Sequence, residues 1–213
     1  ILKYPEYVFF NTTPKKNEIL RGYYSNLPFN GQKLRTKMIS KIIESFCPDV
    51  FIETGTYYGN TLEFFLKYKK PTYSIEVNEE FYLIAKSRFL GNSNLILIKG
   101  DSATELSKIN SQENPTFVYL DAHWYSELPL SEELKALERY KDIIIVIDDF
   151  KIPGNDEWSY DKYGTTELEI QSITFPEVFE LYFPNYSSAS DGGFMTGCIV
   201  LGKGQKALDV LSS

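Results

Sequence analysis

The chain has 213 residues, of which 43% are hydrophobic and 24% charged, and this is enough for one compact domain with a substantial core. Its 29 acidic and 22 basic residues give a net charge of -7, opposite in sign to the basic surface that nucleic-acid binding requires. No apolar run approaches the roughly 20 residues that span a bilayer, and no basic-then-apolar leader opens the sequence. We therefore expect a soluble single domain over 1–213 that binds neither nucleic acid nor a membrane.

Only two cysteines are present, Cys47 and Cys198, and each lies among apolar neighbours. Such a pair is more typical of two buried thiols in a reducing compartment than of a disulfide framework. The sequence therefore favours a cytoplasmic protein.

The first regular element is predicted over 32–46, where apolar residues recur at helical spacing until Pro48 stops the pattern. Residues 1–31 before it are interpreted as an N-terminal cap segment. Short apolar runs then alternate with amphipathic stretches, which is typical of βα units building a mostly parallel sheet. The predicted strands are 50–53, 72–76, 95–99, 117–121 and 143–148. The predicted helices between them are 61–68, 79–89, 103–109 and 131–140.

The cofactor-binding core is thus assigned to 32–149, and the chain after residue 149 has a less regular pattern. Residues 151–184 are rich in aromatic, proline and charged residues, so we interpret 150–185 as an insertion on the substrate side. A final apolar run at 194–201 comes after an Asp-Gly-Gly turn and predicts a closing antiparallel strand within a C-terminal region, 186–213.

The segment 51–61, Phe-Ile-Glu-Thr-Gly-Thr-Tyr-Tyr-Gly-Asn-Thr, places Gly55 and Gly59 between a strand and a helix, where backbone passes close to a ligand. It is not a dinucleotide fingerprint, because three residues separate the glycines, and it is not a phosphate-binding P-loop, because no lysine follows Gly59. Glu76 ends the next strand about 20 residues later, where such folds bind ribose hydroxyls. The alternative is that both glycines serve only the turn and that Glu76 is solvated.

These residues resemble the class I S-adenosylmethionine-dependent methyltransferases, which carry an E-x-G-x-x-x-G loop after strand one and an acid at the end of strand two. The resemblance implies a Rossmann-like three-layer α/β sandwich with a mostly parallel seven-stranded sheet and an antiparallel C-terminal strand. It also implies that Glu76 holds the ribose, and that Asp101 and Ser102 contact the adenine. The residues implied around the methionine part of the cofactor are Glu53, Gly55, Thr56, Gly59 and Thr61.

Three carboxylates come after predicted strands four and five: Asp121, Asp148 and Asp149. Both strands end at the same edge of a parallel sheet, where like charges repel and a divalent cation such as Mg²⁺ is the usual compensation. The pattern is similar to that of catechol O-methyltransferase and the macrocin-type sugar O-methyltransferases, which implies that these three aspartates are metal ligands and that Asp121 also approaches the cofactor. Alternatively, Asp121 contacts only cofactor or substrate while Asp148 and Asp149 cap a turn.

The only histidine, His123, follows Asp121 by two residues and is expected to face the same site. The similar sugar methyltransferases carry a proton acceptor near this position, which implies a general base; a structural role is the equal alternative.

We therefore expect Mg²⁺-assisted O-methylation of a hydroxylated small molecule, such as a sugar or a glycosylated natural product. The alternatives are a methyltransferase without metal, a non-methylating enzyme on the same scaffold, and a protein that only binds the cofactor. The N-terminal segment is compatible with a homodimer, although nothing in the pattern demands one.

Overall fold

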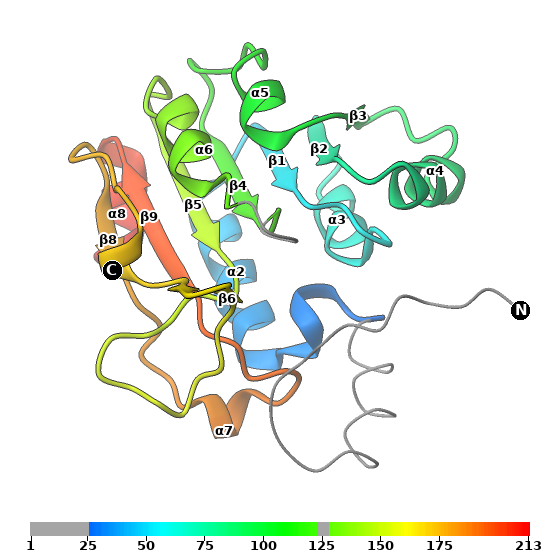
Figure 1. The fold of residues 1–213 in the computed structure, drawn as a ribbon. Helices are drawn as coiled ribbons and strands as arrows, with labels where there is room; N and C mark the ends of the chain where they lie inside the picture. Colours follow the sequence, from blue (N-terminus) through cyan, green and yellow to red (C-terminus); the bar gives the residue numbers. More distant parts are fainter. Residues whose placement is uncertain (1–25, 123–127) are drawn as a thin grey trace, which may run out of the picture.

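The structure, a computed structural model, describes residues 26–122 and 128–213. A seven-stranded sheet runs through the centre and is covered by helices on both faces (Figure 1). The expected Rossmann-like three-layer sandwich is therefore confirmed. Within the described residues no helix is long and apolar enough to cross a membrane.

Five parallel strands form one side of the sheet, in the spatial order β3-β2-β1-β4-β5. Their bounds are β1 Val50–Thr54, β2 Thr72–Glu76, β3 Leu95–Lys99, β4 Thr116–Leu120 and β5 Ile143–Ile147. All five strands predicted from the apolar runs are confirmed to within a residue at either end. Because β1 lies between β2 and β4, the loops after these strands meet at one edge, where such sheets bind ligands.

The other side of the sheet departs from the prediction. Strand β9, Ile199–Lys203, is antiparallel to β5 as expected, but it begins later than the predicted 194. Residues before it form a connection instead, in which the Gly197 amide donates to Ser159 and its carbonyl accepts from Phe150. Strand β8, Glu180–Tyr182, pairs with β9 and completes the sheet. The prediction that all of 150–185 is an insertion on the substrate side was therefore wrong for β8.

Each face of the sheet has its own core, because successive residues of a strand point to opposite sides. On one face Val50 and Ile52 of β1 pack with residues of α5 and α6; on the other Phe51 packs with α2 and α3. The helices that flank the first five strands are α2 Lys33–Phe46, α3 Asn60–Leu66, α4 Glu79–Arg88, α5 Ser102–Leu106 and α6 Leu130–Leu137. The remaining elements are η1 Pro28–Gly31, η2 Ile170–Ser172, α7 Ser188–Asp191, α8 Gln205–Leu211 and a hairpin of β6 Lys162–Tyr163 with β7 Thr166–Glu167.

The two cysteines have different environments. Cys198 is buried as expected, but Cys47 is exposed, so the prediction of two buried thiols was wrong for Cys47. Cys47 follows the last residue of α2 with a left-handed backbone (φ 46°), and its amide donates to Ile43. The chain leaves the helix at this point, which turns the side chain away from the apolar face of α2.

Candidate functional site

The loop after β1 needs its two glycines for different reasons. Both have a φ of +80°, a left-handed backbone that favours glycine. A Cβ atom on Gly55 would overlap the backbone carbonyl of Asp121 at the end of β4. A Cβ atom on Gly59 would meet the ring of Phe89 instead, and Gly59 also forms the N-terminal boundary of α3. The first glycine thus lets the loop lie against β4, and the second lets α3 begin beside α4.

Replacing Gly55 with alanine is therefore expected to remove cofactor binding and to destabilise the protein by more than about 2 kcal/mol, because backbone strain and steric overlap add. Gly91 is a matched control, since its φ is +81° and an added Cβ atom would meet nothing within 4 Å. Gly91→Ala should cost only roughly 1 kcal/mol, from strain alone. Thermal unfolding and titration with S-adenosylhomocysteine compare the two variants, and equal effects in both would contradict the close approach of Gly55 to β4.

A chain of buried polar side chains lies beneath this loop. Ser74 on β2 donates to Glu53 on β1 (2.6 Å), and the Thr56 hydroxyl lies 2.6 Å from that of Ser74. Burial raises the pKa of Glu53 to about 8, against the opposing effect of the Ser74 hydrogen bond. Sequence reasoning missed Ser74, although it is the residue directly opposite Glu53 in the β1–β2 register. Glu53 is thus a buried acid that a cationic ligand group would stabilise in its charged form.

Glu76 is held in place by the same loop. One carboxylate oxygen accepts from the Tyr57 amide (2.8 Å) and the other from the Asn78 amide (2.7 Å). A carboxylate has further lone pairs, so these bonds orient Glu76 without using up its capacity to accept hydrogen bonds from a ligand. The next residue, Val77, is 54% exposed, and it offers an apolar surface beside this acid.

The remaining predicted cofactor contacts have structural partners. Thr61 on α3 accepts a hydrogen bond from the Phe29 amide, 3.3 Å away. Asp101 is exposed and caps α5 by accepting from the Thr104 amide at 2.9 Å, and Ser102 behind it is buried. These contacts place the residues at the sheet edge. Their binding roles stay predictions.

An acidic group lies at the ends of β4 and β5, next to this loop. Burial raises the pKa of Asp121 well above its usual range, and the charges of Asp149, Asp161 and Glu53 raise it further. Burial and the charge of Asp149 raise the pKa of Asp161 to about 7. The Asp161 amide donates to the Asp149 carbonyl at 3.0 Å, so the segment after β5 returns to the sheet edge here.

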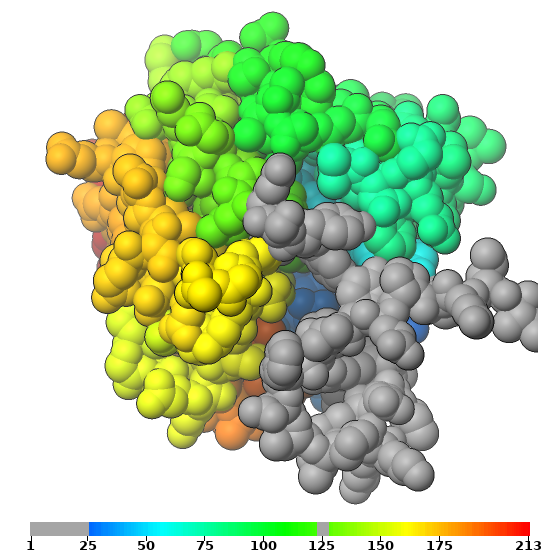
Figure 2. Space-filling view, in the orientation of Figure 1, coloured from blue at the N-terminus to red at the C-terminus, as the bar shows by residue number. Residues whose placement is uncertain are grey.

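Asp161 is a second residue that sequence reasoning missed, because nothing in the irregular segment around it indicated that it returns to the site. In the space-filling view this segment, in yellow, lies on the same face as the green part of the chain (Figure 2). The structure thus brings Asp121 and Asp149 together as predicted from the strand ends, and it adds a third carboxylate.

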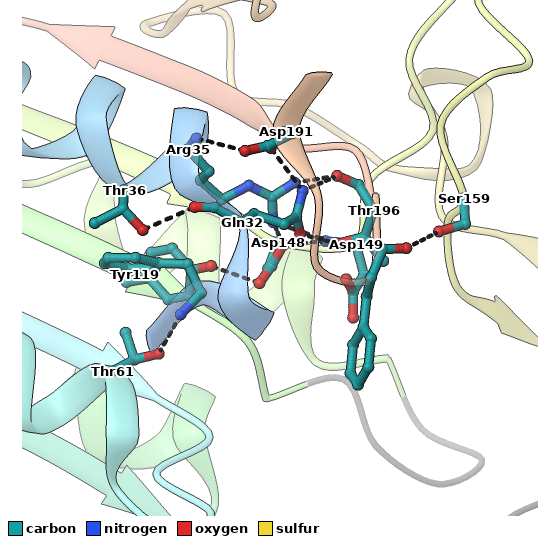
Figure 3. A network of polar contacts seen from close by, with 12 residues as sticks. Gln32, Arg35, Thr36, Thr61, Tyr119, Asp148, Asp149, Ser159, Asp191 and Thr196 are labelled. Atoms are coloured by element: carbon teal, nitrogen blue, oxygen red, sulfur yellow. Dashed lines mark hydrogen bonds and ion pairs between the residues drawn. The ribbon is translucent and has the colours of Figure 1, made fainter. Parts of the chain in front are cut away.

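Asp148 has a different role from its neighbour. It is fully buried and forms an ion pair with Arg35 of α2, whose side chain is also fully buried. Tyr119 of β4 donates to its second oxygen, and the Asp149 amide donates to the first (Figure 3). All these contacts lie inside the protein, between the sheet and α2. Asp149 itself has a left-handed backbone (φ 52°), which turns the chain after β5 toward the site.

The buried ion pair belongs to a wider network that joins α2 to the segment before β9. Gln32 donates to Asp191 (3.0 Å) and to the carbonyl of Thr196 (2.9 Å), and Arg35 donates to the same carbonyl (Figure 3). The Asp191 carboxylate also accepts from the amide of Arg35 (3.2 Å). The network fixes the first turn of α2, where no side-chain cap is present, against the far end of the chain.

The predicted magnesium set of Asp121, Asp148 and Asp149 does not fit this arrangement. Asp148 is already neutralised by Arg35, and the described residues contain no group of three or more His, Cys, Asp or Glu side chains that could hold a metal ion. The predicted base His123 lies outside the described residues. The side chains at this edge of the sheet therefore fit a group of three interacting carboxyl groups, Asp121, Asp149 and Asp161, better than the predicted magnesium site.

No family model matches the sequence. Many solved structures share its fold, including three O-methyltransferases. A protein described as a caffeoyl-CoA O-methyltransferase from Staphylococcus aureus has a TM-score of 0.61 at 15% identity, covering 89% of this chain and 93% of its own. An O-methyltransferase from Bacillus cereus, in complex with S-adenosylhomocysteine, has a TM-score of 0.60 at 15% identity. The match covers 89% of this chain and 92% of its own.

The third is the O-methyltransferase TomG from Streptomyces achromogenes, which is involved in tomaymycin synthesis and was solved with S-adenosylmethionine. It has a TM-score of 0.60 at 13% identity and covers 89% of this chain and 91% of its own. Identities this low establish the fold and leave the chemistry to the site. The chain has the fold of the class I S-adenosylmethionine-dependent O-methyltransferases.

Proposed function

We propose that this protein is an S-adenosylmethionine-dependent O-methyltransferase that acts on a hydroxylated small molecule. The observation that carries the proposal is the pairing of two buried acids, Glu53 and Glu76, with the glycine loop between them. A buried acid with a raised pKa suits the α-ammonium group of the cofactor, and an acid oriented by two amides suits its ribose hydroxyls. Three O-methyltransferases with this fold support the reaction class.

The other cofactor contacts follow from the same placement. Thr56, at the end of the hydrogen-bonded chain from Glu53, and Thr61 at the start of α3 would surround the methionine part. Asp101 and Ser102 would contact the adenine, with the exposed side chain of Val77 against its ring. Asp121 lies behind Gly55, at the end of β4, where it would separate the cofactor from the acceptor.

The acceptor would bind at the three carboxylates beyond the cofactor. Burial raises the pKa of Asp121 and Asp161, so these two carboxyl groups are more easily protonated and can then donate as well as accept hydrogen bonds, which suits the hydroxyls of a sugar or a glycosylated natural product. The cofactor supplies an electrophilic methyl group on a sulfonium, so the protein needs chiefly to orient the acceptor oxygen and to take its proton. His123 is the proposed base.

Transfer without a metal is the form of the reaction that the described residues favour, since Asp148 is paired with Arg35. Methyl transfer is therefore expected to continue in excess chelator at a rate within about twofold of the untreated enzyme, a difference too small for the loss of a Lewis acid. Product formation after dialysis against EDTA, with and without added Mg²⁺, measures this. A loss of activity that Mg²⁺ restores would instead support Mg²⁺-assisted transfer.

The test of the proposed function begins with cofactor binding. Calorimetric titration with S-adenosylmethionine and S-adenosylhomocysteine should show binding, and NAD should not bind because its dinucleotide fingerprint is absent. Incubation with a panel of hydroxylated acceptors should then give S-adenosylhomocysteine and a product heavier by one methylene unit. Binding without any methylated product would favour a cofactor-binding protein, and no binding at all would overturn the proposal.

A further inference from the structure

A second buried acid lies below the cofactor loop, on the opposite face of the sheet from Glu53. Glu133 is on α6, and its side chain is only 1% exposed. The hydroxyl groups of Thr54 and Ser102 lie beside its carboxyl group. Helix α6 packs against α5 on this face (Figure 1). Glu133 lies next to Ser102, at the start of α5.

The two neighbours of Glu133 connect it to both predicted halves of the cofactor site. Thr54 is the last residue of β1 and directly precedes Gly55 of the glycine loop. Ser102 is the first residue of α5 and directly follows Asp101, a predicted contact of the adenine. Glu133 therefore lies where these two segments come together, although it comes from a helix that sequence reasoning did not connect with the cofactor.

Two polar atoms in this group lack a well-formed hydrogen bond. Glu133 Oε1 and Thr54 Oγ1 are both buried, and within 26–122 and 128–213 neither makes a hydrogen bond of good geometry, although the Thr54 hydroxyl lies within reach of the Glu133 carboxyl group. Burial raises the pKa of Glu133 to about 7, with the hydroxyls of Ser102 and Thr54 opposing the rise. An unpaired buried acceptor is costly, so a ligand that brings a hydrogen-bond donor to it gains affinity.

We propose that Glu133, assisted by Thr54, recognises the exocyclic amino group of the cofactor's adenine. The inference rests on the proposed function and adds a residue that determines specificity for the base. The amino group only donates hydrogen bonds, and it would give Glu133 Oε1 the hydrogen bond of good geometry that this atom lacks. Hypoxanthine carries a carbonyl oxygen at the same position, and this oxygen would face the carboxylate as a second acceptor. The site would therefore distinguish an adenine cofactor from its deaminated form.

The test compares two probes, S-adenosylhomocysteine and S-inosylhomocysteine, by calorimetric titration of the full chain. The wild-type protein should bind the adenosyl compound roughly 10- to 100-fold more tightly, the effect of one hydrogen bond to a charged group. In Glu133→Gln the ratio should fall to within about threefold, because an amide offers either a donor or an acceptor. Glu132→Gln, a neighbour on α6 that is not buried, should keep the wild-type ratio.

A second variant keeps the proposal testable if Glu133→Gln does not fold. Thr54→Val replaces threonine with a residue of the same shape that has no hydroxyl group. It should also lower the ratio of the two affinities, by a smaller factor than Glu133→Gln. An unchanged ratio in Glu133→Gln, or equal binding of both probes by the wild type, would overturn this inference alone. Failure of the wild type to bind S-adenosylhomocysteine at all would overturn the proposed function, and the inference with it.

Discussion

Glu53→Gln is expected to weaken the binding of S-adenosylhomocysteine about 100-fold while making the protein without ligand more stable at pH 8. Affinity falls because a neutral amide no longer pairs with the α-ammonium group of the ligand. Stability rises because burial raises the pKa of Glu53 from 4.5 to about 8. The folded protein then holds a proton that the unfolded chain releases, so this group lowers stability progressively as the pH rises from 4.5 through 8.

The size of the stability effect follows from the shift, at about 1.4 kcal/mol for each unit of pKa. Urea unfolding at pH 5 and pH 8 should show a gain for Glu53→Gln of a few kcal/mol at pH 8 and little change at pH 5. Binding of the ligand to the wild type at pH 7 should release a proton from Glu53, which calorimetry in buffers of different ionisation enthalpy detects. Glu80→Gln, an exposed neighbour of the site, serves as the control.

In Glu53→Gln, a loss of affinity together with a gain in stability would distinguish an acid that binds the ligand from an acid with a structural role. If Glu53 served only to hold Ser74 and the loop, its replacement would lower both quantities together. Unchanged affinity with increased stability would show that the buried acid binds something other than this cofactor.

Local patterns in the sequence were sufficient for the parallel half of the sheet and for the position of the glycine loop after β1. A parallel strand covered on both faces is a continuous apolar run, and β1, β4 and β5 are buried at every position. The glycine loop was predictable because two glycines within five positions, between a strand and a helix, are typical of a left-handed turn that passes close to a ligand. Glu76 followed from its place at the end of a strand.

The features that the sequence did not predict depend on contacts between distant segments. Arg35 precedes Asp148 by 113 positions, so no local spacing relates them, and the aspartate pattern was interpreted as a metal site. Strand β8 has only three residues and is partly exposed, so it has no apolar run to identify it. Asp161 reaches the site only because the chain after β5 turns back and pairs with Asp149.

Arg35→Met should lower the free energy of unfolding by roughly 3–5 kcal/mol, because it leaves Asp148 charged and unpaired in the core. Both side chains of this ion pair are almost completely buried, so water cannot replace the lost partner. Adding Asp148→Asn should recover a large part of the loss, since an amide carries no charge and still accepts from Tyr119. The interaction energy from this double-mutant cycle measures the coupling of the pair.

The matched control for this cycle is Lys141→Met, which breaks an exposed ion pair with Glu113 and should cost less than about 1 kcal/mol. Urea unfolding of all these proteins gives the free energies, with the slope of each transition as the check that folding stays two-state. Asp148→Asn alone is then informative about function. If Asp148 is the partner of Arg35, Asp148→Asn is less stable than the wild type and its activity stays unaffected by chelator. If Asp148 binds Mg²⁺ instead, Arg35→Met is as stable as the wild type, and the activity of Asp148→Asn no longer responds to the metal.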